Sequence, residues 1–211
     1  MRLEEFKGKN WLGERILVAV QHDQGGKDRI LEAARSLFTQ RGFHQTPIAE
    51  LAVSAQVSVG QIYRLFKGKD DIINAIVETQ SAERARDMEQ LYTQLHAGEI
   101  DVEQTFERLL LQVVDKQDEA LAFDILAEAF RNPKVGRTIA GMCEGFRKLI
   151  RDIACIANPR LSGEALDAAE EMIMACIFGL GHRSLGSPKL GPERTANGAA
   201  RMIVAALRAI D

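Results

Sequence analysis

The chain has 211 residues, of which 46% are hydrophobic and 27% charged. These proportions are ordinary for a folded protein of one or two domains. The N-terminus carries Glu4 and Glu5 where a secretory leader would be positive, and no segment approaches the roughly 20 apolar residues that span a bilayer. We therefore expect a cytoplasmic protein that makes no membrane contact.

The cysteines and histidines show no pattern of a metal site. Cys143, Cys155 and Cys176 form no C-x-x-C pair, and together with the four histidines they give no zinc spacing. We expect buried thiols on helices. The sequence predicts neither a metal nor another cofactor.

The net charge of −3 is unevenly distributed. Residues 27–69 carry seven Lys and Arg against three acids, residues 1–26 are balanced, and residues 70–211 hold the acidic excess. A basic module on an acidic body is typical of a nucleic-acid binder with a separate second domain. We therefore divide the chain into an N-terminal extension (1–26), a basic domain (27–69) and a second domain (70–211).

The first clear helix follows a predicted flexible linker at residues 22–26, which contains two glycines. Apolar residues with helical spacing predict a helix over 27–41, ended by Gly42 as a C′ glycine. The role of residues 1–26 stays open between an extra helix, a DNA-contacting arm and a disordered tail.

Two short helices come next. Thr46 is expected to cap the first, with Pro47 at its first position, and this helix ends near Ala55. Ser58 and Gln61 form the S-x-x-Q pattern of a capping box and predict a second helix that ends at Gly68.

The rest of the chain also predicts helices and no strand. The expected segments are 69–97, 102–117, 119–131, 133–156, 162–182 and 192–210. The fold class is therefore all-α.

Two short helices joined by a turn, with a third before them, are typical of a helix-turn-helix, whose second helix lies in the DNA major groove. Its N-terminal residues, here Val59, Gly60 and Gln61, come nearest to the bases. Glycine lets the backbone approach DNA, and glutamine pairs with adenine unless capping occupies its side chain. Phosphate contacts are expected from the hydroxyl and ammonium groups of Thr46, Ser58, Tyr63, Lys67 and Lys69.

Residues 29–72, RILEAARSLFTQRGFHQTPIAELAVSAQVSVGQIYRLFKGKDDI, resemble the N-terminal domain of the TetR family of repressors. The matching features are Ala33-Ala34, Leu37-Phe38, Gly42-Phe43, Thr46, Leu51-Ala52, Val57-Ser58, Gly60, Tyr63, Phe66 and Lys69. Two positions depart from the family pattern. Many members have Gly where this chain has Gln56, and many have a phosphate-contacting His where this chain has Leu65.

The resemblance implies a homodimer with an N-terminal three-helix DNA-binding domain and a C-terminal helical ligand-binding and dimerisation domain. The last two helices of such proteins usually form a four-helix bundle with those of the partner subunit. A small molecule in the second domain changes the spacing of the two DNA-binding heads and releases the operator.

Residues 70–211 carry no catalytic signature, so we expect no enzyme. Their Phe and Met residues form either the core or the wall of a site for a largely apolar effector. The candidate wall residues are Phe106, Phe123, Met142, Phe146, Met174 and Phe178.

The last two predicted helices are rich in small residues that suit close packing against a twofold copy. With the larger apolar residues beside them, they are Ala168, Ala169, Met172, Ile173, Ala175, Ile177, Gly179, Gly198, Ala199, Ala200, Met202, Ile203, Ala205, Ala206 and Leu207.

The function predicted is a transcriptional repressor that leaves a palindromic double-stranded operator when a small effector binds. The same scaffold could act as an activator or global regulator, or as a helical ligand-binding protein without a DNA function. Mapping the bound site relative to a promoter distinguishes a repressor from an activator or global regulator. A DNA-binding assay distinguishes all of these from a ligand-binding protein without a DNA function.

Overall fold

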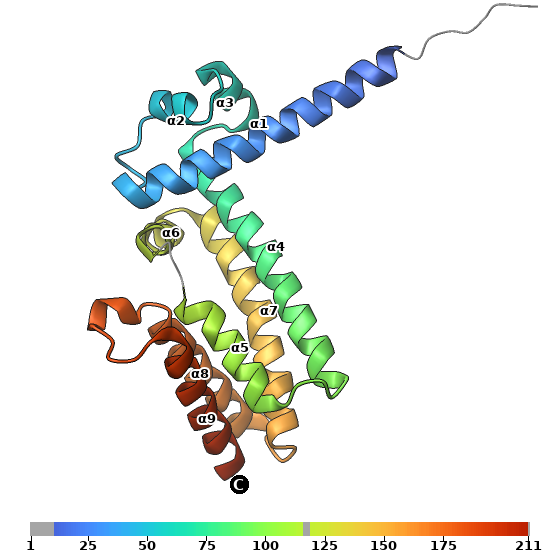
Figure 1. Ribbon diagram of the computed structural model, residues 1–211, viewed down its shortest axis with the longest axis vertical. Helices are drawn as coiled ribbons and strands as arrows, with labels where there is room; N and C mark the ends of the chain where they lie inside the picture. Colours follow the sequence, from blue (N-terminus) through green and yellow to red (C-terminus); the bar gives the residue numbers. More distant parts are fainter. Residues whose placement is uncertain (1–10, 116–118, 211) are drawn as a thin grey trace, which may run out of the picture. The chain divides into compact units, whose positions relative to one another are not determined.

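The computed structural model describes residues 11–115 and 119–210, and the side chains from residue 25 onward within these ranges (Figure 1). The described residues form nine α-helices, one short 3₁₀ helix and no strand, so the all-α prediction is confirmed. The helices are α1 (Trp11–Arg41), α2 (Ile48–Ser54), α3 (Val59–Leu65), α4 (Lys69–His96), α5 (Val102–Val114), α6 (Glu119–Arg131), α7 (Pro133–Ala157), α8 (Gly163–Leu180) and α9 (Pro192–Ala209), and the 3₁₀ helix is η1 (Arg183–Gly186).

The chain divides into two compact units, Met1–Ile72 and Ile73–Asp211. The boundary lies inside the first turn of α4, three residues after the boundary expected from the sequence. Each unit has its own buried residues and is described separately.

In the first unit, α2 packs against α1 and α3. Its core contains side chains with no exposed surface on all three helices, namely Ile30, Ala34, Phe38, Leu51 and Ile62. At the end of α1, Gly42 has a φ of 85° and donates its N–H to the Phe38 carbonyl at 2.8 Å. The predicted C′ glycine is therefore confirmed.

Helix α1 is longer than expected, because it runs without a break through residues 22–26. The prediction of a flexible linker there is wrong. Each glycine costs a helix only about 1 kcal/mol relative to alanine, which neighbouring residues and packing can offset. Gly26 is buried, and its missing side chain leaves room for the amide of Gln61 on α3.

The start of α2 also differs from the expectation. The helix begins at Ile48 with Pro47 as its N-cap residue and has no side-chain cap. The Thr46 hydroxyl donates instead to the Gly42 carbonyl at 3.0 Å. Thr46 therefore closes the loop between α1 and α2.

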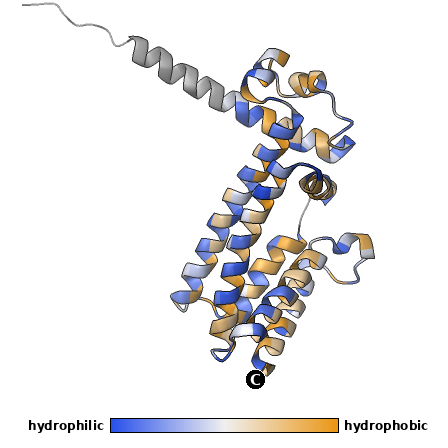
Figure 2. Ribbon diagram, turned by 180° about the vertical axis from the view of Figure 1, so that it is seen from behind, coloured by the Kyte–Doolittle hydropathy of each residue, from blue (hydrophilic) through white to orange (hydrophobic). Residues whose placement is uncertain are grey.

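In the second unit, α5 packs against α7, α8 and α9, and α6 packs against α7. The centre of this bundle contains Leu110, Ile150, Ala154, Ala196 and Ala200, none of which has exposed surface. Figure 2 shows hydrophobic residues recurring along these helices. The Asn158 amide at the end of α7 donates to the carbonyls of Leu207 and Ile210, which ties α7 to the end of α9.

Among the described residues, no helix is both long and apolar enough to cross a membrane. Within the same ranges, His, Cys, Asp and Glu do not gather in groups of three that could hold a metal ion. Cys143 and Cys155 are half-buried on α7, whereas Cys176 is exposed on α8. The expectation of a buried thiol is therefore wrong for Cys176, which faces away from the core of its own chain.

Candidate functional site

The turn between α2 and α3 is built from backbone hydrogen bonds and one side-chain cap. The N–H of Val57 donates to the Ala52 carbonyl at 3.0 Å, and the Ser58 hydroxyl accepts the N–H of Gln61 at 3.1 Å. Ile62 is fully buried and anchors α3 in the core. The N-terminal turn of α3 is therefore held firmly while its outer side remains open.

The open side of α3 carries five of the eight residues predicted to contact DNA. Val59 is 41% exposed and Tyr63 is 56% exposed. The others are exposed as well, and a Cβ placed on Gly60 would meet only the Ser58 hydroxyl, at 3.8 Å. We call this the α3 surface, and its members are Ser58, Val59, Gly60, Tyr63 and Lys67.

Two other predicted phosphate contacts are directed into the protein. Thr46 is 1% exposed, and its hydroxyl is used within the loop. The Lys69 ammonium donates to the carbonyls of Phe43, His44 and Thr46 at 2.8, 2.9 and 3.2 Å, and lies 5.1 Å from the centre of the Phe43 ring. The structure therefore gives Lys69 the role of holding the 43–46 loop to the start of α4.

Gln61 is the third predicted contact that faces inward. Its backbone N–H is capped by Ser58, but its side chain does not return to Ser58, so only half of the predicted capping box forms. The amide nitrogen Nε2 is buried over Gly26 and has no hydrogen-bond partner among the described residues. Adenine recognition by Gln61 would require this amide to leave α1.

The two departures from the family pattern have different consequences. Gln56 has a φ of 53°, the left-handed conformation that glycine adopts without strain. Leu65 is half-buried, and its Cδ1 lies 4.0 Å from the Cβ position of residue 26. Leu65 therefore packs toward α1 in place of a polar side chain.

Residues 30–76 match the family model described as bacterial regulatory proteins, tetR family. This range begins in the second half of α1, contains both short helices and the α3 surface, and ends in α4. The match to the TetR family therefore lies in the first unit and the start of α4.

Two relatives carry names of transcriptional regulators. Over 117 residues the chain is 32% identical to the HTH-type transcriptional regulator UidR of Escherichia coli K12, an alignment that covers 53% of this chain and 56% of UidR. It is 32% identical over 127 residues to the probable HTH-type transcriptional regulator YttP of Bacillus subtilis, covering 60% of this chain and 55% of YttP. The chain thus spans a little over half the length of these relatives.

Solved structures share the fold at low sequence identity. The regulator FadR of Bacillus subtilis, crystallised with stearoyl-CoA, superposes with a TM-score of 0.67 at 19% identity over 84% of this chain and 97% of FadR. A regulator from Pseudomonas aeruginosa PAO1 gives a TM-score of 0.71 at 18% identity over 87% of this chain and 90% of that structure. The fold shared with these two regulators therefore extends through both units.

In the second unit, the six predicted ligand residues do not meet at one place. Phe106 is fully buried in the core cluster, and Phe146 and Met174 pack against that cluster. Phe123 and Phe178 are 39% and 58% exposed, and both rings contact His182, with centroids 4.6 and 4.7 Å away. The sixth residue, Met142, is half-buried on α7.

Sequence reasoning missed His182, which follows Phe178 by one helical turn. Its Nδ1 lies 2.8 Å from the Phe178 carbonyl, while its Nε2 is buried without a hydrogen-bond partner in the described part of the chain. The spacing of four residues in the predicted helix was the available signal.

An ion-pair network joins α7 to α8. Glu170 is 7% exposed and accepts hydrogen bonds from Arg151, at 2.9 Å, and from Arg147, and Arg151 also pairs with Asp167 at 2.6 Å. The guanidinium groups of Arg151 and Arg147 hold the pKa of Glu170 below its ordinary value. Glu170 is therefore held between two arginines of α7 and is shielded from solvent.

Most of the small and apolar residues of α8 and α9 lie on an inner or an outer face, whereas Gly198 and Ala199 are half-buried. The inner face packs in the core of its own chain and comprises Ala169, Ile173, Ile177, Ala200, Ile203 and Leu207. The outer face is exposed, with Met172 at 64% and Met202 at 74%. We call it the α8–α9 outer face, and it comprises Ala168, Met172, Ala175, Gly179, Met202, Ala205 and Ala206.

Proposed function

We propose that this chain is a homodimeric DNA-binding transcriptional regulator, a repressor that leaves a palindromic operator when a small molecule binds its second unit. The observation that carries the proposal is the exposed N-terminal turn of α3, which Ile62 anchors in the core and where Gly60 presents no side chain. The basic balance of residues 27–69 favours the same partner, because positive charge attracts the phosphate backbone. The regulator names of the relatives support it.

Each residue of the α3 surface has a role that its chemistry fits. Val59 offers methyl groups to thymine, and Gly60 lets the backbone come close to the DNA. The Tyr63 hydroxyl and the Lys67 ammonium are free to reach phosphates. Ser58 caps α3 as an acceptor, and its own O–H proton remains available to a phosphate oxygen.

The proposal of a small-molecule effector has support from proteins of the same fold. FadR of Bacillus subtilis was crystallised with stearoyl-CoA. A regulator from Saccharomonospora viridis, which superposes with a TM-score of 0.69 at 20% identity over 85% of this chain and 95% of that structure, was crystallised with choline. One of these ligands is a large anion and the other a small cation, so the fold alone does not select the effector.

The proposal of a homodimer rests on the α8–α9 outer face. Exposed small and apolar residues on each of the last two helices suit a four-helix bundle with a second copy, because small side chains let helices approach closely. Met172 and Met202 would be the largest side chains buried in it. These residues do not contribute to the core of their own chain, so dimerisation is the role that accounts for them.

Fluorescence anisotropy tests DNA binding directly. Labelled duplexes from the region upstream of the chain's own gene are titrated with protein at several salt concentrations. We expect binding to a palindrome whose half-sites lie about 34 Å, or a multiple of that distance, apart, with affinity that falls steeply as salt rises. Absent or salt-insensitive binding would contradict the proposal and favour a ligand-binding protein without a DNA function.

Two tyrosine variants test whether the α3 surface contacts the operator. Tyr63→Ala should weaken operator binding by about ten- to 150-fold, since a hydrogen bond to a charged group contributes about 1.5–3 kcal/mol. Tyr92→Ala, which removes a half-exposed tyrosine from α4 in the second unit, should change affinity less than twofold. Equal losses in both variants would remove Tyr63 from the contact set.

A further inference from the structure

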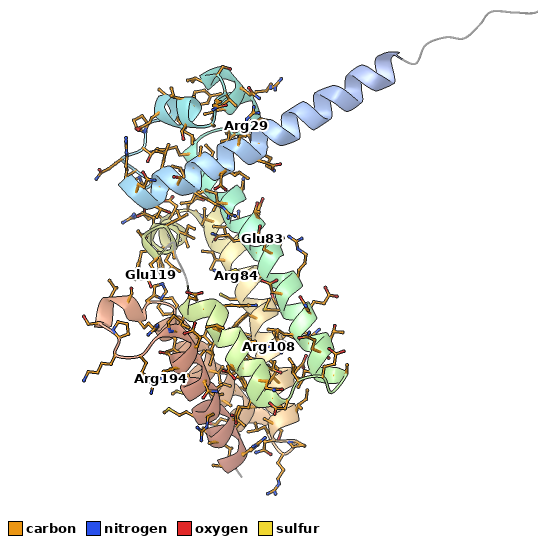
Figure 3. All side chains as sticks on the ribbon, in the orientation of Figure 1. Arg29, Glu83, Arg84, Arg108, Glu119 and Arg194 are labelled. Carbon is orange, nitrogen blue, oxygen red and sulfur yellow. The ribbon has the colours of Figure 1, made fainter. Side chains whose placement is uncertain are left out.

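Helix α1 carries a residue without a side chain on its core-facing side. Residues four positions apart lie on the same side of an α-helix, and Gly26 precedes the fully buried Ile30 by four positions. Gly26 is itself buried, whereas the adjacent Gly25 is exposed. Figure 3 labels Arg29, three residues after Gly26, on the part of α1 that lies beside α3. Gly26 therefore leaves room between the two helices where a larger residue would fill it.

The room over Gly26 is occupied by a side chain of α3. Nε2 of Gln61 lies 2.6 Å from the position that a Cβ of residue 26 would take, and Cδ1 of Leu65 lies 4.0 Å from it. Gln61 and Leu65 are four positions apart and share one side of α3. We call this position of the Gln61 amide, bounded by Gly26 and Leu65, the α1 seat. The seat exists because residue 26 is a glycine.

The α1 seat gives the amide nitrogen no hydrogen bond. Nε2 of Gln61 is buried and has no hydrogen-bond partner among the described residues. A side-chain amide nitrogen carries two N–H donors, and burying a donor without a partner costs the folded state its full desolvation penalty. The seated amide nitrogen therefore loses its hydration and gains no hydrogen bond in return. A partner outside the seat that satisfies the amide will compete well with it.

Gly60 leaves the amide a way out of the α1 seat. Successive residues of a helix are about 100° apart around its axis, so Gly60 follows Gln61, and Val59 follows Gly60, on going around α3 toward its exposed side. Gly60 is exposed, and a Cβ there would meet only the Ser58 hydroxyl, at 3.8 Å. Rotation about the side-chain bonds of Gln61 can therefore carry its amide past Gly60 to the α3 surface, while its backbone N–H stays bound to Ser58.

We propose that Gly26 is a positioning residue for base recognition: it seats the Gln61 amide against α1 in the DNA-free chain, and the amide rotates out past Gly60 to pair with an adenine of the operator. The inference rests on the proposed function, since the operator supplies the base. In the outer position the amide donates to N7 of adenine and accepts from its N6 amino group. Adenine thus provides the hydrogen bonds that the α1 seat lacks.

The seat lowers operator affinity, because the apparent Kd rises as the fraction of chains with the amide outside falls. A side chain at residue 26 removes the seat, since its Cβ would stand 2.6 Å from Nε2 and the amide is the end of a flexible side chain. Gly26→Ala therefore holds the Gln61 amide outside before DNA arrives. Gly25→Ala is the matched control, because it adds the same methyl group where nothing lies within 4 Å.

Base-pair substitutions in the operator test the adenine contact. The operator is the duplex found in the anisotropy titration, and each base pair is replaced in turn, symmetrically in both half-sites. We expect one A·T pair per half-site at which replacement weakens binding of the parent chain by about tenfold. Gln61→Ala should lose the preference at that pair and keep the preferences at all others. An adenine preference profile that Gln61→Ala leaves unchanged would overturn the contact.

The two glycine variants test the control that residue 26 exerts. Gly26→Ala should bind the operator about threefold tighter than the parent chain, because its amide is already outside the seat, and should keep the preference for adenine. Gly25→Ala should leave the Kd unchanged. Weaker binding of Gly26→Ala to every duplex, or equal binding by the two variants, would overturn the proposal.

An NMR measurement on the DNA-free chain tests the seat without an operator. The side-chain NH₂ signal of Gln61 is identified by its loss in Gln61→Ala, and its exchange with water is compared with that of Gln90, which is exposed on α4. Slower exchange than at Gln90 in the parent chain, and equal exchange in Gly26→Ala, supports the α1 seat. Fast exchange in the parent chain overturns it.

The two sets of measurements separate this inference from the proposed function. Absence of binding to any duplex would contradict the proposed function, and the adenine contact with it. Operator binding without an adenine preference that depends on Gln61 would contradict this inference alone and leave the proposed function standing.

Discussion

The side-chain amide of Gln61 on α3 lies over Gly26 of α1, so closely that a Cβ on residue 26 would stand 2.6 Å from the amide nitrogen. A Cβ on the neighbouring Gly25 would meet nothing within 4 Å. The two glycines occupy adjacent positions in one helix and differ in what faces them. They therefore form a matched pair for measuring the contact.

Gly25→Ala should raise the free energy of unfolding by about 0.5–1 kcal/mol, the usual penalty of a glycine inside a helix. Gly26→Ala should raise the free energy of unfolding by less, because the new methyl group must displace the Gln61 amide. In a Gln61→Ala background, Gly26→Ala should raise the free energy of unfolding by as much as Gly25→Ala does. Urea unfolding measures all three values, and equal gains in the parent background would contradict the contact.

Lys67 and Lys69 lie two residues apart, but their substitution should affect different properties, DNA binding for Lys67 and stability for Lys69. Lys69→Met removes the donor to three loop carbonyls and should lower the free energy of unfolding by about 1.5–3 kcal/mol. Lys67→Ala should leave stability within about 0.5 kcal/mol and reduce the salt slope of operator binding by about one unit. A slope lowered by Lys69→Met in folded protein would return Lys69 to the list of phosphate contacts.

Gln56 is strained by its positive φ in the turn before α3. Gln56→Gly should stabilise the protein by about 1 kcal/mol, because glycine adopts the left-handed conformation without a Cβ clash. Gln56→Ala keeps the Cβ and should give no such gain. The midpoint of urea unfolding distinguishes the two, and a gain from alanine would show that the side chain, not the backbone, is responsible.

The Glu170 network makes stability depend on pH. Because the folded state lowers the pKa of Glu170, its contribution is complete above the unfolded value of about 4.3 and is lost as the pH falls through the lower folded value. Glu170→Gln should lower the thermal midpoint at pH 7 and reduce its fall between pH 5 and pH 3. Circular dichroism measures both, with the exposed Glu171→Gln as control. An unchanged pH profile in Glu170→Gln would contradict this role.

The α8–α9 outer face should control the oligomeric state. Met172→Glu places a charge within the proposed bundle and should convert the dimer into a monomer in sedimentation equilibrium. Leu185→Glu changes another exposed apolar residue, 75% exposed on η1, and should leave the dimer intact. A monomeric parent chain, or a dimer that survives Met172→Glu, would contradict the proposed interface.

The sequence predicted the helices well because their signals are local. Apolar spacing, the C′ glycine at 42 and the Ser58 cap each act within one or two turns, and the structure contains all three. The linker prediction failed because glycines weaken a helix only mildly, while the packing of Gly26 against Gln61 involves residues 35 positions apart. Local sequence patterns carry no information about contacts between residues so far apart in the chain.

Side-chain roles were harder to predict for the same reason. Lys69 and Thr46 have the chemistry of phosphate contacts, but the chain folds so that their polar atoms meet loop carbonyls. The two arginine partners of Glu170 lie on the preceding helix, so the sequence around Glu170 does not reveal them. Residue type indicates what a side chain can bind, whereas the tertiary fold determines which partner lies within reach of it.

Helices α4 and α7 each contain a long stretch without buried side chains, which bears on local dynamics. Residues 78–90 of α4 and 136–148 of α7 include no buried side chain, whereas buried residues flank both stretches. Segments with few buried apolar contacts open at lower free-energy cost than the core around them. Amide protons in these two stretches will therefore exchange with solvent sooner than those at the buried ends of the same helices.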